Sequence, residues 1–151
     1  MEIDFKGTGV AIVTPFNEDK SIDFIGLSNL IEYLIDGGVE FLVSMGTTGE
    51  SAVLNKDEKN KIVAFTKNKI NSRVPFILGI GGNNTSNVVA QIKSTDFSGI
   101  DAILSVSPAY NKPTQEGFTN ILKQYLKLAR QILFYIMFPE EHLQTCLLRQ
   151  H

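Results

Sequence analysis

Two threonines framed by glycines form the most suggestive chemical group in the chain. Thr47 and Thr48 stand in GTTGES, residues 46–51, directly after an apolar run. Their hydroxyls and the backbone N–H groups can face one point, because glycine removes the side chains that would block close approach. A small carboxylate suits such donors. The alternative is a tight strand-to-helix turn in which Thr and Ser only cap, since these residues favour turns and caps in any case.

A tyrosine set between two prolines is the second candidate. Tyr110 lies in SPAYNKP, residues 107–113, where the prolines stiffen the loop. Its phenol is a candidate for proton transfer. A packed surface aromatic is the alternative, and for this motif taken alone that interpretation is favoured.

Several function classes are excluded by what the chain does not contain. No Gly-x-Gly-x-x-Gly opens a helix after the first strand and no Gly-x-x-x-x-Gly-Lys-Ser/Thr is present, so no nucleotide site of either kind is expected. No cluster of His, Cys and Asp has metal-ligand spacing, and we expect no metal. A net charge of −2 predicts no basic face for nucleic acid.

The composition predicts a cytoplasmic protein with one domain. One cysteine excludes an internal disulfide framework and suits a reducing compartment. The N-terminal residues include acids and no apolar run, which argues against a signal peptide. No window of about 20 apolar residues is present, so we expect no membrane span.

Five short apolar runs predict the strands that position these motifs. They are rich in Val, Ile, Leu and Phe and barely alternate, which is typical of strands buried on both faces of a parallel sheet. Amphipathic helical patterns separate them. The runs begin at Val10, Phe41, Phe76, Ala102 and Ile132. The helix signals are a stop at Gly37-Gly38, a capping box of Asn55 with Glu58, and caps at Thr85 or Ser86 and at Thr114.

The order of these elements predicts α/β architecture. Strand and helix alternate about every 30 residues, the size of a βα unit. An open doubly wound sheet and a (β/α)8 barrel both fit this order. Polar loops after the strands favour the barrel, whose active sites lie at that face. A barrel needs about 250 residues, so we expect an incomplete (β/α)8 TIM barrel with about the first five strands and four helices.

Four motifs in order resemble the dihydrodipicolinate synthase family. They are GTGVAIVTPF, GTTGES, GIGGNNT and SPAYNKPTQEG, and the likeness runs from about Phe5 to Tyr135. GTTGES alone is typical of the wider group of pyruvate-dependent class I aldolases, which includes N-acetylneuraminate lyase as the alternative. The segment YNKP-x-QEG favours the synthase. A non-catalytic fragment is the other alternative.

The resemblance implies a lyase of lysine biosynthesis by the diaminopimelate pathway, which condenses pyruvate with aspartate semialdehyde. A lysine forms a Schiff base with pyruvate, so no cofactor is implied. Thr48 would hold the pyruvate carboxylate. Thr47, Tyr110 and Tyr135 would relay a proton, with Tyr135 at the end of the fifth strand as general acid and base. The family is a homo-oligomer, a homotetramer, in which Tyr110 would reach into the neighbouring subunit's site.

Residues 136–151 depart from this resemblance. The family has Asn-Val-Pro-Gly-Arg-Thr after Tyr135, and a coding sequence for residues 136–146 can be written that encodes this motif two nucleotides out of frame. We therefore expect residues 1–135 to be the N-terminal part of a barrel and 136–151 to be an out-of-frame tail; a truly divergent tail is the alternative. At most a weak amphipathic helix is expected after Pro139. His142, Cys146 and His151 are expected to be neither metal ligands nor catalytic.

The Schiff-base lysine of the family lies on the sixth strand, and no lysine in this chain matches it. The lost arginine of the family motif would bind the carboxylate of the aldehyde substrate. The 151-residue chain is therefore expected to be inactive. Its first and fifth strands are expected to be open edges.

Overall fold

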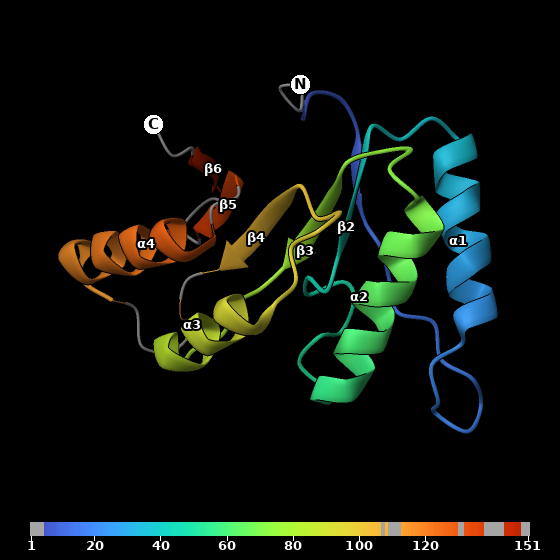
Figure 1. The fold of residues 1–151 in the computed structure, drawn as a ribbon, viewed down its shortest axis with the longest axis horizontal. Coiled ribbons are helices and arrows are strands. Elements are labelled where there is room, and N and C mark those ends of the chain that lie inside the picture. Colours follow the sequence, from blue (N-terminus) through green and yellow to red (C-terminus); the bar gives the residue numbers. More distant parts are fainter. Residues whose placement is uncertain (1–4, 107, 109–112, 130–131, 138–143, 149–151) are drawn as a thin grey trace. The chain divides into compact units, whose positions relative to one another are not determined.

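Strands and helices alternate along the chain as the sequence predicts (Figure 1). The computed structural model describes residues 5–106, 108, 113–129, 132–137 and 144–148. The chain divides into two compact units, Met1–Leu78 and Gly79–His151. No described helix is both long enough and apolar enough to span a membrane.

The first unit is built on three parallel strands. They are β1 (Gly9–Ala11), β2 (Phe41–Ser44) and β3 (Phe76–Gly79). The middle strand, β2, pairs with both of the others. Helix α1 (Phe24–Asp36) connects β1 to β2, and α2 (Lys56–Ile70) connects β2 to β3. Each parallel connection therefore passes through a helix, as βαβ units require.

The core of the first unit lies where the two helices meet the sheet. Helices α1 and α2 lie side by side (Figure 1). The rings of Phe24 and Phe65 join them, with centroids 5.0 Å apart. Both helices and the two strands β2 and β3 place aliphatic or aromatic side chains in full burial. These include Leu27, Ile31, Leu42, Ile62, Ile70 and Phe76.

Local signals mark the start of α2 and the end of α1 where the sequence predicts them. Asn55 accepts a hydrogen bond from the Glu58 amide at 3.0 Å, and the Glu58 carboxylate accepts one from the Asn55 amide at 2.8 Å. The expected capping box is therefore confirmed. Gly37 caps the end of α1 and Gly38 adopts φ 83°, so the predicted glycine stop is confirmed as well.

The second unit contains two helices and the remaining strands. Helix α3 (Thr85–Ser94) precedes β4 (Ala102–Val106), and α4 (Gln115–Ala129) precedes β5 (Ile132–Met137). Strands β4 and β5 are parallel, with Ser105 opposite Tyr135. The Ile80 amide donates to the Leu104 carbonyl at 2.9 Å, which holds the segment after β3 against β4.

The caps of the second unit match the sequence in part. The Gly117 amide donates to the Thr114 hydroxyl at 3.2 Å, which confirms the predicted cap of α4. The cap of α3 is Asn84, whose side chain accepts from the Asn87 amide at 3.2 Å, so the prediction of Thr85 or Ser86 is wrong by one residue. An Asn carboxamide caps a helix as well as a Ser or Thr hydroxyl does, and Asn84 directly precedes Thr85 and Ser86 in the sequence.

A buried tyrosine joins the two helices of the second unit. Tyr125 of α4 is buried, and its phenol is hydrogen-bonded to the hydroxyl of Thr85 at the start of α3. Burial raises the pKa of Tyr125, and the hydrogen bond opposes that rise in pKa. This hydrogen bond therefore connects α3 with α4.

A sixth strand differs from the expectation for the tail. Residues Gln144–Leu148 form β6, which pairs antiparallel with β5, placing Cys146 opposite Tyr135. The expected helix is therefore wrong for these residues, and β5 is not an open edge. An unpaired strand edge offers a row of N–H and C=O groups to any extended segment that can reach it. Pairing of this kind uses backbone groups, so it depends little on which side chains the added segment carries.

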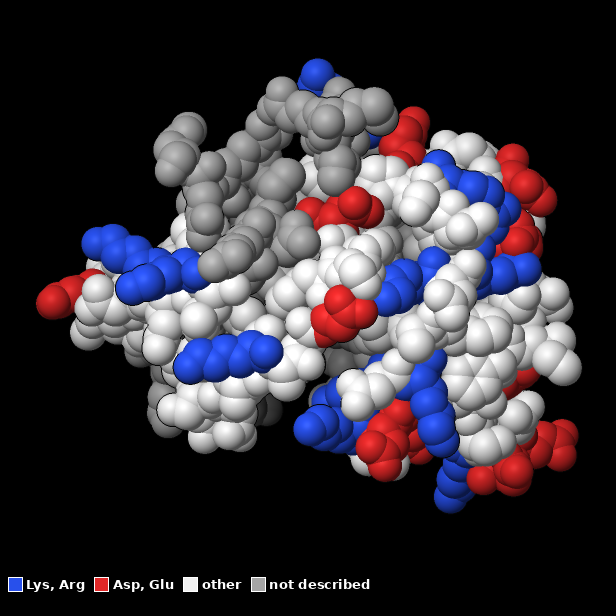
Figure 2. Space-filling model, viewed as in Figure 1, with Lys and Arg blue, Asp and Glu red and all other residues white. Residues whose placement is uncertain are grey.

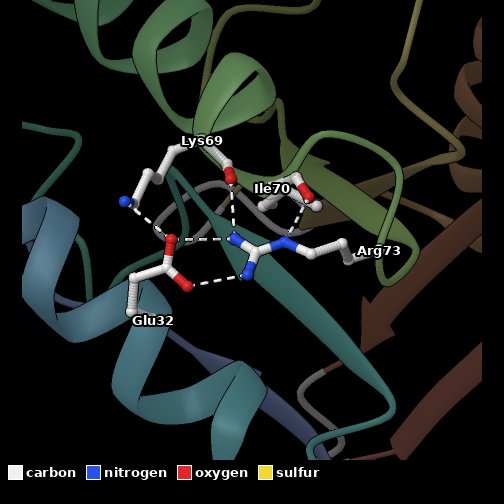
Figure 3. Close-up of polar contacts among 4 residues, drawn as sticks. All are labelled: Glu32, Lys69, Ile70 and Arg73. Atoms are coloured by element: carbon white, nitrogen blue, oxygen red, sulfur yellow. Dashed lines mark hydrogen bonds and ion pairs between the residues drawn. The ribbon is translucent and has the colours of Figure 1, made fainter.

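An ion cluster fastens the end of α2 to α1 (Figure 3). The Arg73 guanidinium donates to both carboxylate oxygens of Glu32, at 2.7 and 3.0 Å, and to the Lys69 and Ile70 carbonyls. The Lys69 ammonium lies 2.6 Å from Glu32. Hydrogen bonds from Arg73, and then from Lys69, lower the pKa of Glu32 to about 2. Arg73 thus satisfies helix-end carbonyls while pairing with a helix far along the chain.

We predict that Glu32→Gln lowers the melting temperature at pH 7 by a few degrees, and less at high salt, because the cluster is exposed. The folded pKa of Glu32 lies below its ordinary 4.5, so the carboxylate stabilises the fold above that pH and loses its effect as pH falls toward about 2. Thermal denaturation across this range should show the two proteins converging. Glu18→Gln, at an exposed carboxylate before α1, is the control. A difference that stays constant down to pH 2 would contradict the assignment.

Candidate functional site

The GTTGES segment folds into a strained turn at the carboxyl end of β2. Met45, which follows the strand, is buried with φ 61°, and Glu50 has φ 52°. Such left-handed backbone costs about 1–3 kcal/mol at a residue with a side chain, and it persists where the surroundings enforce it. The Gly49 amide donates to the Gly46 carbonyl at 3.2 Å, and the Glu50 amide to the Thr47 carbonyl at 3.0 Å. Two overlapping turns therefore project residues 47 and 48.

Thr47 and Thr48 offer their donors to solvent. Both residues are exposed. Among the described residues, no backbone carbonyl accepts from the amide of either threonine. Two exposed residues thus carry hydroxyl donors within one turn, and neither backbone N–H donates to a described carbonyl, a combination that suits a small anion. Asn55 caps α2, so these threonines do not cap that helix.

A buried threonine in the segment that follows β1 supports this turn. Thr14 is buried, and its hydroxyl donates to the Gly49 carbonyl at 2.7 Å. A Cβ at Gly49 would lie 3.3 Å from both the Ile12 carbonyl oxygen and the Met45 amide nitrogen. The turn therefore packs tightly against the carboxyl end of β1. The sequence marks Thr14 only as a polar residue after a strand, since nothing local pairs it with Gly49.

The second unit contains a buried hydroxyl on β4. The Ser105 Oγ is buried and has no hydrogen-bond partner among the residues that the structure describes. A Cβ at Gly81 would lie 2.8 Å from the Val106 Cγ1 and 3.8 Å from that oxygen, so only glycine fits here. By strand register Ser105 stands opposite Tyr135. The sequence shows no signal for Ser105, because a serine within an apolar run is compatible with simple burial.

The remaining predicted site residues are placed as follows. Tyr135 is the fourth residue of β5, which continues to Met137. Thr47 and Thr48 belong to the first unit and Tyr135 to the second. Tyr110 lies outside the described residues. The proton relay of Thr47, Tyr110 and Tyr135 therefore stays a prediction.

The charges of the described surface do not point to a metal or a nucleic acid. Among the residues described, no three His, Cys, Asp or Glu side chains come together as a metal site would require. His142 and His151 lie outside these residues. On the face drawn in Figure 2, basic and acidic side chains are interspersed over the described surface.

Comparisons with known proteins agree on one family. A family model described as the dihydrodipicolinate synthetase family matches residues 4–138. The 4-hydroxy-tetrahydrodipicolinate synthase of Flavobacterium psychrophilum is 58% identical over 113 residues, which cover 75% of this chain and 39% of the relative. That of Cytophaga hutchinsonii is 47% identical over 127 residues, covering 84% and 42%. This chain thus spans about two fifths of the length of these relatives.

Solved structures give the same fold. Dihydrodipicolinate synthase DapA-2 of Bacillus anthracis has a TM-score of 0.84 at 37% identity, covering 89% of this chain and 46% of that one. A chloride-inhibited dihydrodipicolinate synthase of Acinetobacter baumannii, complexed with pyruvate, has a TM-score of 0.83 at 36% identity, covering 87% and 45%. The expected architecture, an incomplete TIM barrel, is therefore confirmed.

We predict that Gly49→Ala destabilises the chain by about 1–3 kcal/mol, because its Cβ would press on two backbone atoms that cannot move aside like a flexible side chain. Gly46→Ala in the same turn is the matched control, since nothing lies within 4 Å of its added Cβ. It should change the free energy of unfolding by less than about 0.5 kcal/mol. Urea denaturation measures both, and equal effects would contradict the close approach at Gly49.

Proposed function

The chain belongs to the dihydrodipicolinate synthetase family, and from this premise we propose that its full-length protein is a 4-hydroxy-tetrahydrodipicolinate synthase of which this chain is the N-terminal part. Such an enzyme is a lyase that condenses pyruvate with aspartate semialdehyde in lysine biosynthesis. The exposed donors of Thr47 and Thr48, on a strained turn at a strand end, carry this proposal. The rival aldolase, N-acetylneuraminate lyase, has no observation in its favour.

Thr48 is proposed to hold the carboxylate of pyruvate. Thr48 is exposed and carries a hydroxyl and an amide N–H as donors, and a carboxylate accepts such bonds more strongly than a neutral carbonyl would. The structural neighbour from Acinetobacter baumannii was solved with pyruvate, which supports a pyruvate site in this fold. No metal or cofactor is proposed, because the Schiff base to a lysine would supply the chemistry.

The proposed reaction begins with a lysine amine adding to the pyruvate ketone. Water leaves, and the resulting imine loses a proton to become an enamine, whose carbon forms the bond to the aldehyde. Proton transfer is assigned to Tyr135, Thr47 and Tyr110. A phenol has an ordinary pKa near 10, so it needs hydrogen-bonded hydroxyl partners to pass a proton at neutral pH. Tyr110 is proposed to come from a neighbouring subunit of a cytoplasmic homo-oligomer.

Residues 136–151 are proposed to be an out-of-frame tail. The family match ends at residue 138, close to the proposed displacement after Tyr135. Pairing of β6 with β5 does not oppose this proposal, because backbone pairing is largely independent of side chains. The genomic sequence across codon 135 tests it. An intact frame that encodes residues 136–151, with no family motif two nucleotides away, would show that the tail is divergent instead.

A chimera tests the proposed function. Residues 1–135 of this chain are joined to the remainder of the Flavobacterium psychrophilum synthase, which supplies the lysine. The chimera should condense pyruvate with aspartate semialdehyde, and borohydride should trap one pyruvate on a lysine by intact mass. Thr48→Val should weaken pyruvate use, and Tyr135→Phe should lower the rate by about 10²–10⁴-fold, the usual contribution of general acid–base catalysis.

The 151-residue chain alone is the control in that experiment. None of its lysines matches the Schiff-base lysine, so it should form no pyruvate adduct under the same conditions. A stoichiometric adduct on one of its lysines would contradict the proposed inactivity. A folded chimera that traps pyruvate but does not react with the semialdehyde would argue for another aldolase.

A further inference from the structure

We infer that Thr14 is a positioning residue for the Thr47–Thr48 turn, which it holds in the conformation that presents donors to a carboxylate. This inference rests on the proposed pyruvate site and deepens it. Thr14 stands 35 residues before Gly49 in the chain, so its bond to the Gly49 carbonyl is a tertiary restraint from the segment that follows β1. Neither threonine of the turn touches Thr14 through a hydrogen bond, so Thr14 acts through the Gly49 peptide.

The peptide unit between Gly49 and Glu50 is held at both of its polar groups. Its carbonyl, on Gly49, accepts from the Thr14 hydroxyl, and its N–H, on Glu50, donates to the Thr47 carbonyl. The preceding peptide unit is held separately by the bond from the Gly49 amide to the Gly46 carbonyl. Rotation of the peptide unit between Gly49 and Glu50 would break the bond from Thr14 and change the left-handed backbone of Glu50. The Thr14 bond therefore opposes relaxation of the strained turn.

The hydroxyl of Thr14 is buried, which strengthens its hydrogen bond to the Gly49 carbonyl. Thr14 is 4% exposed, while the preceding Val13 is 47% exposed, so the chain turns the polar side chain inward and leaves the apolar one outside. The hydrophobic effect alone would favour the opposite arrangement, with the valine buried and the threonine exposed. A buried hydroxyl at 2.7 Å from its acceptor makes a well-formed hydrogen bond, shielded from competing water.

The test uses the 151-residue chain and two variants of Thr14. Thr14→Val keeps the shape and removes the donor, whereas Thr14→Ser keeps the donor. Amide hydrogen exchange is followed by NMR at Gly49 and Glu50, with Leu27 in α1 as the distant reference. Sodium pyruvate is the titrant, methyl pyruvate the neutral control, and the Thr48 amide shift the binding signal.

We expect Thr14→Val to speed exchange at Gly49 and Glu50 about five- to ten-fold, the effect of one hydrogen bond, and to weaken pyruvate binding by a similar factor. Exchange at Leu27 should stay unchanged, and Thr14→Ser should stay within about three-fold of the native chain in each readout. If Thr14→Val does not fold, Thr14→Cys replaces it, with a weaker donor of similar size and an intermediate expected effect.

Three outcomes would overturn the inference. They are native exchange at Gly49 and Glu50 in Thr14→Val, a rise in exchange that is equal at Leu27, and no rescue by Thr14→Ser. If the native chain itself shows no pyruvate-dependent shift at Thr48, the proposed pyruvate site fails. The exchange rates still decide whether Thr14 positions the turn, so the two failures are distinguishable.

Discussion

The hydrogen-bonding requirement of parallel strands is the constraint on which the rest of this structure depends. Parallel neighbours cannot be joined by a short turn, so a helix must cross between them and bury an apolar stripe on the sheet. Strands covered in this way become apolar on both faces, as β3 is from Phe76 to Gly79. The strands of one parallel group also end at one edge, and the polar loops gather there for that reason.

The same requirement for backbone hydrogen bonds explains why β5 pairs with β6. A strand with no neighbour leaves its N–H and C=O groups unpaired, and β5 meets this need by accepting β6 in the antiparallel direction. The side-chain sequence of residues 144–148 was not required to resemble a family strand for this to occur. Pairing of this kind follows from the backbone alone, so it carries no information about function.

The proposed pyruvate site depends on the conformation of one turn. Residues 46–50 combine two hydrogen-bonded turns with left-handed backbone at Met45 and Glu50, and the sheet holds this arrangement in place. The result is a set of exposed donors on a rigid support, which is how preorganised sites bind small anions at low entropic cost. Membership of the dihydrodipicolinate synthetase family is the reason to propose pyruvate as the bound anion. This chain spans about two fifths of the length of its relatives, and the proposed reaction also needs residues that the chain does not contain.

The sequence by itself determined the features that depend on neighbouring residues. The Asn55–Glu58 capping box, the stop at Gly37-Gly38 and the order of strands and helices all follow from local chemistry and apolar pattern. The order of the motifs also determined the family, because GTTGES and YNKP-x-QEG are specific in combination.

Only the tertiary structure decided the contacts between distant residues. The Thr14 hydroxyl bonds to Gly49 across 35 residues, and Arg73 pairs with Glu32 across 41. Ser105 is buried, with no hydrogen-bond partner in the described part of the chain. The helix expected in the tail is a strand, because an open edge outweighs the weak helical preference of a short segment. Sequence patterns report what a residue prefers locally, whereas these features depend on which groups the folded chain brings together.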